Sequence, residues 1–167
     1  MATLRQHYRD SVRVTTMLDL YGLPRDFPGK EEAAIQPSPL ERVRLIEQRL
    51  VEAVADKRFI PHLQLHEYES LLFANADAFY CYFTDRVTYG PAIRQLSQVR
   101  NQFESPEDID DGPLTAPSKR IIDLIPTYAP AKPLAGVQIA QNIGVSTSMR
   151  ECPHFGAWVS KLSALRP

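Results

Sequence analysis

The sequence predicts an α/β fold in which a partial parallel sheet is covered by helices and the C-terminal half is mainly helical. Two apolar runs, 12–18 and 59–65, flank a helical pattern at 39–54. The order strand, helix, strand favours two parallel neighbours in one sheet, because the crossover returns the chain to the same sheet. Beyond the second run, helical patterns prevail. We therefore expect one domain with an α/β part at 1–75 and a helical part at 76–167.

Each element of the first half has its own signal. The run at 12–18 is rich in β-branched residues, and glycines and prolines interrupt any helical repeat in the segment that follows it. Ser38 and Pro39 supply an N-cap and a proline at the first helical position. The expected elements are, in order, a helix at 3–10, a strand at 12–18, a loop at 20–30, a helix at 39–54 and a strand at 59–65.

The second half is expected to be a cover of helices. Apolar residues recur at helical spacing, and prolines and acidic turns separate the segments. The acidic segment 104–115 is expected to be an exposed loop. Two parallel strands make a poor sheet, because parallel sheets are normally larger and buried on both faces. Another strand is expected from 136–139 or from another chain. The predicted helices are 68–74, 76–83, 91–103, 118–125, 133–143 and 153–165.

Composition narrows the functional class. The formal net charge is −1, so contact with nucleic acid would need a local patch, and the charge balance argues against a general DNA coat. Cys81 and Cys152 stand far apart and form neither a disulfide framework nor a zinc ribbon. The first residues lack a signal-peptide core, and no apolar run reaches the roughly 18 residues of a membrane helix. We expect a cytoplasmic protein without membrane contact.

Polar side chains follow both predicted strands where each strand ends. Asp19 follows the first strand, and His66, Glu67 and Glu69 follow the second. The carboxyl ends of parallel neighbours meet at one edge of the sheet, where open α/β sheets place their ligands. Carboxylate oxygens are the ligands that Mg²⁺ and Mn²⁺ prefer. Asp19 and Glu67 are therefore the candidate metal ligands, with His66 or Glu69 as candidate catalytic residues that assist water.

The same residues have simpler interpretations. Acidic groups are favoured at helix N-termini, and Asp19 is suited to accept hydrogen bonds in a turn. In a helix Glu67 and Glu69 would diverge by about 200°, so we expect Glu69 behind the ligands or paired with Lys119 or Arg120. His66 is a candidate general base, a positioning residue or a satisfied interior histidine. Zinc is a weaker alternative that rests on histidines at 62 and 66 sharing a strand face.

A predicted helix N-terminus carries the candidate phosphate-binding residues, Lys119 and Arg120. Free N–H groups and a cation would both face an anion there, and Lys119 would also stabilise charge during catalysis. The alternative is an inert surface pair. The acidic turn at 107–112 lacks EF-hand spacing and is expected to be solvated. His154 opens the last helix and is expected to be a cap or core residue, with docking near the site as the alternative.

Four ordered blocks resemble the bacterial family known as domain of unknown function 4276. They run almost from end to end of the chain. The resemblance implies a Toprim-like fold, similar to the metal-binding core of topoisomerases, primases and overcoming-lysogenization-defect nucleases. It also implies an ATPase partner of the SMC or ABC-like type and a role in defence against phage or plasmid DNA. The blocks are VTTMLDLYGLPRDFPG (14–29), FIPHLQLHEYESLLFA (59–74), PEDIDDGPLTAPSKRI (106–121) and IGVSTSMRECPHFGAWVSKL (143–162).

The chain departs from the family pattern in two places. Family members, as the resemblance implies, begin with a further strand and a glycine–glutamate motif, so we expect this chain to be truncated and its metal site to be incomplete. The usual D-x-D pattern reads Asp19-Leu20-Tyr21, and tyrosine is no ordinary Mg²⁺ ligand. Two functions follow as expectations. One is a Mg²⁺-dependent nuclease or phosphodiester-processing subunit; the other is a non-catalytic module that binds an ATPase or a separate N-terminal half through an open sheet edge.

Overall fold

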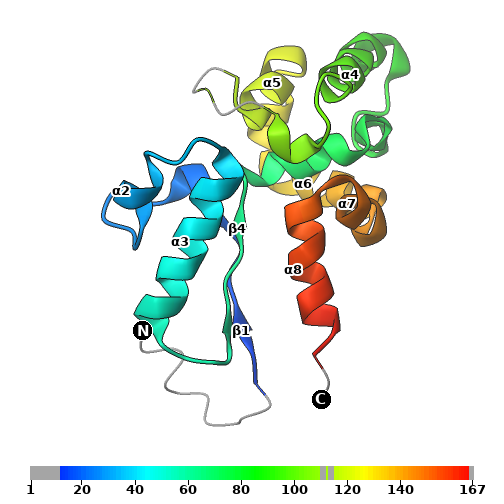
Figure 1. Ribbon diagram of the computed structural model, residues 1–167. Coiled ribbons are helices and arrows are strands. Elements are labelled where there is room, and N and C mark those ends of the chain that lie inside the picture. Colours follow the sequence, from blue (N-terminus) through cyan, green and yellow to red (C-terminus); the bar gives the residue numbers. More distant parts are fainter. Residues whose placement is uncertain (1–11, 110–111, 113–114, 166–167) are drawn as a thin grey trace.

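Two parallel chain segments form the centre of the α/β part. The computed structural model describes residues 12–109, 112 and 115–165 (Figure 1). β1 (Val14–Thr15) pairs in parallel with β3 (Phe59–Ile60), and β2 (Leu18–Asp19) pairs in parallel with β4 (Leu63–Gln64). The predicted parallel neighbours are confirmed, although each predicted strand is divided in two. The helix expected at 3–10 lies outside the described residues.

A proline explains why the strands are divided. Pro61 has no N–H to donate to the ladder. Beside it, the Thr16 hydroxyl accepts a hydrogen bond from the His62 N–H at 3.2 Å and donates one to the His62 carbonyl oxygen at 3.3 Å. The Leu18 N–H then bonds to the same carbonyl oxygen at 3.3 Å, and β2 continues the pairing. A threonine side chain therefore bridges the interruption and fixes the backbone at His62.

The strand pair lies between two helices. α3 (Pro39–Val54) begins at the predicted cap, where the Ser38 hydroxyl accepts the Glu41 N–H, and buries Val43 and Ile46 against Leu63 and neighbouring apolar residues. On the other side lies α8 (Pro153–Ser163) (Figure 1). Its Trp158 stacks on His62 at 4.4 Å between ring centroids. Alternation along the second strand explains the arrangement, because successive side chains point to opposite faces.

The helical half has its own core. Its largest fully buried side chains come from segments far apart in sequence and include Phe73, Phe79, Tyr128 and Ile139. A separate apolar cluster lies under α3. The helices of this half are η2 (Tyr68–Ala74), η3 (Ala76–Cys81), α4 (Arg86–Arg100), η4 (Pro106–Asp108), α5 (Pro117–Leu124), α6 (Tyr128–Ile143), α7 (Val145–Glu151) and α8.

Several expected boundaries are wrong. α4 and α6 each begin five residues before the predicted start, and Pro91 and Pro133 lie inside the helices. The strand considered at 136–139 is part of α6. α7 was not predicted. Gly144 separates it from α6 with a positive φ of 77°, a backbone conformation that glycine adopts without strain.

Two segments expected to be loops contain local structure. The segment at 20–30 holds η1 (Leu20–Gly22) and the start of α2 (Lys30–Ala33), whose short helices bury Leu20 and Ala33 under α3. In the segment at 104–115, Glu107 is 3% exposed, so the expectation of a solvated acidic turn is wrong there. Its carboxylate instead accepts the first N–H groups of α8. No helix within the described residues is long and apolar enough to cross a membrane.

Candidate functional site

The carboxylate of Asp19 lies against the backbone between Glu67 and Glu69. Asp19 ends β2, and its Oδ1 accepts a hydrogen bond from the Tyr68 N–H at 2.9 Å. Parallel pairing of β2 with β4 brings the two strand ends to the same edge. The structure thus places the Asp19 carboxylate beside the backbone of the residues that follow β4.

Glu67 ties this edge to the helical half. Its Oε2 accepts a hydrogen bond from the Ser118 N–H at 3.0 Å, in the first turn of α5. A carboxylate is favoured at this position, because the first N–H groups of a helix have no partner within the helix. The expected helix N-terminus thus does face the acidic residues, and a protein carboxylate occupies one of its N–H groups.

Glu69 is the most deeply buried member of the group. It is 1% exposed, and its Oε1 accepts hydrogen bonds from the Tyr128 hydroxyl at 3.3 Å and from Lys132 Nζ at 2.9 Å. The expected pairing of Glu69 with Lys119 or Arg120 is wrong. Lys132 and Tyr128 are one turn apart on α6, so the helix presents both to the carboxylate.

The charges of this group act on one another. Burial raises the pKa of Asp19, and the negative charges of Glu69 and Glu67 raise it further, against the Tyr68 N–H and the charge of Lys132. Desolvation lowers the pKa of Lys132, but its hydrogen bond with Glu69 and the three carboxylate charges outweigh that effect and raise it. Asp19, Glu67 and Glu69 with Lys132 form what we term the acidic cluster. Its three carboxylates carry more negative charge than Lys132 offsets.

Each carboxylate of the acidic cluster uses one oxygen atom in the contacts above. Within the described part of the chain, no hydrogen bond engages Asp19 Oδ2, Glu67 Oε1 or Glu69 Oε2. Asp19 also lines a cavity of about 550 Å³. The cavity is lined by Met17, Leu18, Asp19, Gly22, Leu23, Pro24, Phe27 and Tyr68. A small hydrated cation has a route to this carboxylate.

His66 is held beneath the strand end. It is 1% exposed, and its Nδ1 lies 3.0 Å from the Tyr21 hydroxyl. Its φ of 63° is a left-handed conformation that is uncommon for a residue with a side chain and often marks a functional segment. Tyr21 stands at the second position of the D-x-D pattern and contacts His66. A positioning role fits this buried ring better than direct proton transfer with bulk water.

The two predicted phosphate-binding residues, Lys119 and Arg120, lie in different surroundings. Lys119 is exposed on the first turn of α5. Arg120 donates from Nε to the Thr115 carbonyl oxygen at 2.8 Å, and its guanidinium lies 5.9 Å from the Phe103 ring centroid. Arg120 is thus engaged with the segment before α5 and with the segment that follows α4.

Residues missed in the sequence join the acidic cluster through tertiary contacts. Tyr128 and Lys132 lie about 60 positions from Glu69, and no motif links them. The pKa of Tyr128 is raised by burial and by the Glu69 charge beside it. Their spacing of four on a helix was the one available signal, and many pairs share that spacing. The carboxylates were recognisable in the sequence because they follow strands. Tyr128 and Lys132 lie on a helix and follow no strand.

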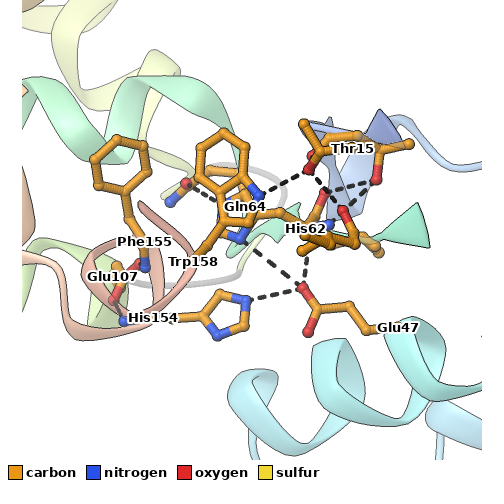
Figure 2. A network of polar contacts seen from close by, with 11 residues as sticks. Thr15, Glu47, His62, Gln64, Glu107, His154, Phe155 and Trp158 are labelled. Carbon is orange, nitrogen blue, oxygen red and sulfur yellow. Dashed lines mark hydrogen bonds and ion pairs between the residues drawn. The ribbon is translucent and has the colours of Figure 1, made fainter. Parts of the chain in front are cut away.

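His62 and His154 belong to a second polar cluster, together with Glu47 of α3 (Figure 2). The considered pairing of His62 with His66 does not occur, because His66 turns to Tyr21 whereas His62 stacks between His154 and Trp158. His154 therefore docks beside the strand pair rather than capping α8 with its side chain.

A family model matches nearly the whole chain. The family model described as Domain of unknown function (DUF4276) matches residues 2–163. No curated protein and no solved structure matches the chain. The description of the family names no activity.

Proposed function

The chain belongs to the family described as a domain of unknown function, DUF4276, and we propose that it is a Mg²⁺- or Mn²⁺-dependent phosphodiester-processing subunit of the nuclease type. Asp19 and Glu67 bind the cation through their second oxygen atoms. Glu69 lies behind them and sets the charge of the site through Lys132. The acidic cluster at the ends of two parallel strands is the observation that carries this proposal.

The chemistry of the acidic cluster supports a hard divalent cation. Two or three carboxylates with free oxygen atoms make an oxygen-rich site, which suits Mg²⁺ or Mn²⁺. Such an ion binds phosphate oxygens, polarises the phosphorus and lowers the pKa of a bound water. Burial raises the pKa of Asp19, and the charges of Glu69 and Glu67 raise it further; a bound cation would relieve the repulsion among these carboxylates.

The remaining predicted residues receive roles that fit their positions. His66 positions the strand end through Tyr21. Lys119, which is exposed on α5, contacts the nucleic-acid phosphate as it approaches, with Arg120 holding the segment before the helix. An ATPase of the SMC or ABC-like type, a nucleic-acid substrate and a place in prokaryotic defence against phage complete the proposal; they are supported by the family resemblance.

Calorimetry with Mg²⁺ and Mn²⁺ on the full chain tests the metal site. We expect Asp19→Asn and Glu67→Gln to weaken binding at least tenfold, because each removes one ligand charge. The matched control is Asp26→Asn, which removes an exposed carboxylate from the same loop and should leave binding unchanged. Asp19→Asn should keep or slightly raise thermal stability, because it removes a partly buried charge. Wild-type chain that binds neither ion would refute the proposal.

A strand edge favours a second function, that of a non-catalytic interaction module. The N–H groups of Val14 and Leu18 face the partner strand, so those of Thr15 and Met17 point away from it. No described residue accepts either N–H, and Met17 is 39% exposed. Such an edge accepts a strand from another polypeptide. Met17→Pro should then abolish association with the partner ATPase, whereas Asp19→Asn should not; the opposite result favours the metal-dependent function.

A further inference from the structure

Three side chains from three elements meet on the other side of the strand pair from the α3 core. Glu47 extends from α3, His62 from the interruption between β3 and β4, and His154 from the first turn of α8 (Figure 2). Their ligand atoms all lie within 4.8 Å of one another. Glu47 Oε1 is 3.1 Å from His154 Nε2 and 3.9 Å from His62 Nδ1. We call these three residues the histidine–glutamate cluster.

A chain of hydrogen bonds sets the tautomer of His62. The Ser70 hydroxyl donates to the Leu65 carbonyl oxygen at 3.4 Å, so it accepts the hydrogen bond that Gln64 Nε2 donates at 3.0 Å. The Gln64 amide is thereby oriented with Oε1 toward His62 Nε2, 3.3 Å away. Nε2 must carry the proton to make this contact, and Nδ1 is left with a lone pair. Second partners of this kind orient the metal-binding histidines of proteins.

The lone pair of His62 Nδ1 faces a second acceptor. The ring is 0% exposed, and no described residue makes a hydrogen bond with Nδ1. The atom ahead of it is Glu47 Oε1, which already accepts the Leu63 N–H at 2.8 Å. Two acceptors that face each other in a buried place repel unless a cation lies between them.

The neutral imidazole is the form that binds a metal ion. Burial and the nearby His154 both lower the pKa of His62, against the Gln64 contact and the Glu47 charge, and so favour that form.

We propose that Glu47 Oε1, His62 Nδ1 and His154 Nε2 bind a divalent transition-metal ion, with Zn²⁺ as the best fit. Two imidazole nitrogens and one carboxylate oxygen are zinc ligands, whereas Mg²⁺ prefers oxygen atoms alone. The ion links α3, the strand pair and α8. It is independent of the acidic cluster and of the function proposed for it.

The distances require a small adjustment on binding. Zinc bonds of about 2.0–2.1 Å place the ligand atoms of a tetrahedral site about 3.3 Å apart. The pair Glu47–His154 is already near that separation. His62 Nδ1 must approach Glu47 Oε1 by less than 1 Å, and it lies within 4.8 Å of His154 Nε2. The rings of His62 and His154 are stacked at 4.9 Å, so the His154 ring must turn. It has room to do so, because His154 borders a cavity of about 360 Å³.

That cavity also provides an entry path and a place for a fourth ligand. It is lined by Leu40, Leu65, Glu104, Ser105, Glu107, Asp108, Arg150, Glu151, Pro153 and His154. Three protein ligands leave one coordination position for water. Glu107 stabilises His154 from behind, because its two carboxylate oxygens accept the N–H groups of His154 and Phe155 at 2.8 and 3.0 Å.

Titration of the untagged full chain with Zn²⁺ and Co²⁺ after chelator treatment tests this proposal. Trp158 is the single tryptophan of the sequence and stacks on His62, so its fluorescence should change with one equivalent of Zn²⁺. Co²⁺ should give the intense visible bands of a tetrahedral nitrogen and oxygen site. Mg²⁺ should leave the fluorescence unchanged.

Substitutions locate the ion. His154→Ala and Glu47→Gln should each weaken Zn²⁺ binding at least tenfold, and Asp19→Asn should leave it unchanged because it alters the acidic cluster. His154→Ala removes a partly exposed ring, so this variant should fold even if His62→Gln does not. Circular dichroism checks that it is folded. Folded wild-type chain that binds no Zn²⁺ or Co²⁺ overturns the proposal. So does Zn²⁺ binding that survives both His154→Ala and Glu47→Gln, or that is lost in Asp19→Asn.

Discussion

Glu69 shows how a single side chain acquires its role from its surroundings. A carboxylate without access to water costs several kcal/mol unless a cation and hydrogen bonds compensate it. Here Lys132 and the Tyr128 hydroxyl supply that compensation on one oxygen atom. Lys132 is itself 46% exposed, so it brings charge to Glu69 without being buried. The pair fixes the position of the acidic cluster against α6.

Breaking this pair from one side should be costly. Lys132→Met should lower the free energy of unfolding by about 1–3 kcal/mol, because Glu69 stays buried without its cation. Glu69→Gln should cost less, since glutamine still accepts from Tyr128. The double variant should recover at least about 1 kcal/mol relative to the sum of the single variants. Urea unfolding measures the free energy of unfolding of all three variants. Strictly additive losses would show that Glu69 and Lys132 do not stabilise each other.

At the scale of elements, the junction of α7 and α8 depends on a glycine. A Cβ on Gly156 would lie 2.4 Å from the Met149 carbonyl oxygen, well inside contact distance. The backbone of α8 therefore approaches the end of α7 more closely than any side chain allows. This approach sets the direction in which α8 leaves α7, and with it the placement of His154 and Trp158.

Gly156→Ala should lower the free energy of unfolding by about 2–3 kcal/mol, because the obstacle is backbone and cannot rotate away. The matched comparison is Gly144→Ala, where a Cβ meets nothing within 4 Å and the penalty comes from the positive φ alone. That variant should lose about 1 kcal/mol. Thermal unfolding followed by circular dichroism measures both. Equal losses would show that the α7–α8 contact is not tightly packed.

The elements also show where sequence reasoning succeeds. The helix at α3 was predicted closely, because a local cap and proline define its start. Parallel pairing followed from the crossover. The starts of α4 and α6 were predicted wrongly from their prolines. A proline is favoured in the first turn of a helix, but it is also tolerated further inside when packing compensates. Strand-end carboxylates were predictable, whereas Lys132 and Glu107 took their roles from contacts that no local spacing encodes.

At the scale of the whole molecule, the strand pair separates the core under α3 from the helical half. Polar contacts span this division: Trp158 Nε1 donates to the Thr15 hydroxyl at 2.8 Å, and His154 contacts Glu47. His62 is buried at their centre. The docking of α8 therefore depends on these buried polar groups, which would bind water or protons if they were exposed.

The metal-free chain should lose stability in mild acid through His62. Its pKa is about 4 in the folded chain and about 6.5 when unfolded, so the unfolded state binds the proton more tightly. The contribution is fully present above pH 6.5, and it is lost as the pH falls from 6.5 to 4, by at most about 3 kcal/mol. Urea unfolding in the presence of a chelator measures it. His62→Gln should flatten this part of the profile; an unchanged slope would mean that other groups cause it.

The origin of the histidine–glutamate cluster has a consequence for the order of folding. Glu47 and His154 are separated by 107 positions in the chain. Closing so long a loop costs entropy, and the packing of α8 offsets that cost only once the helix has docked. The three ligands therefore meet after α3, the strand pair and α8 have assembled. An ion at this site would therefore not guide the early steps; it would bind a finished structure and slow its opening. Occupancy would thus lengthen the lifetime of the folded chain without speeding its formation.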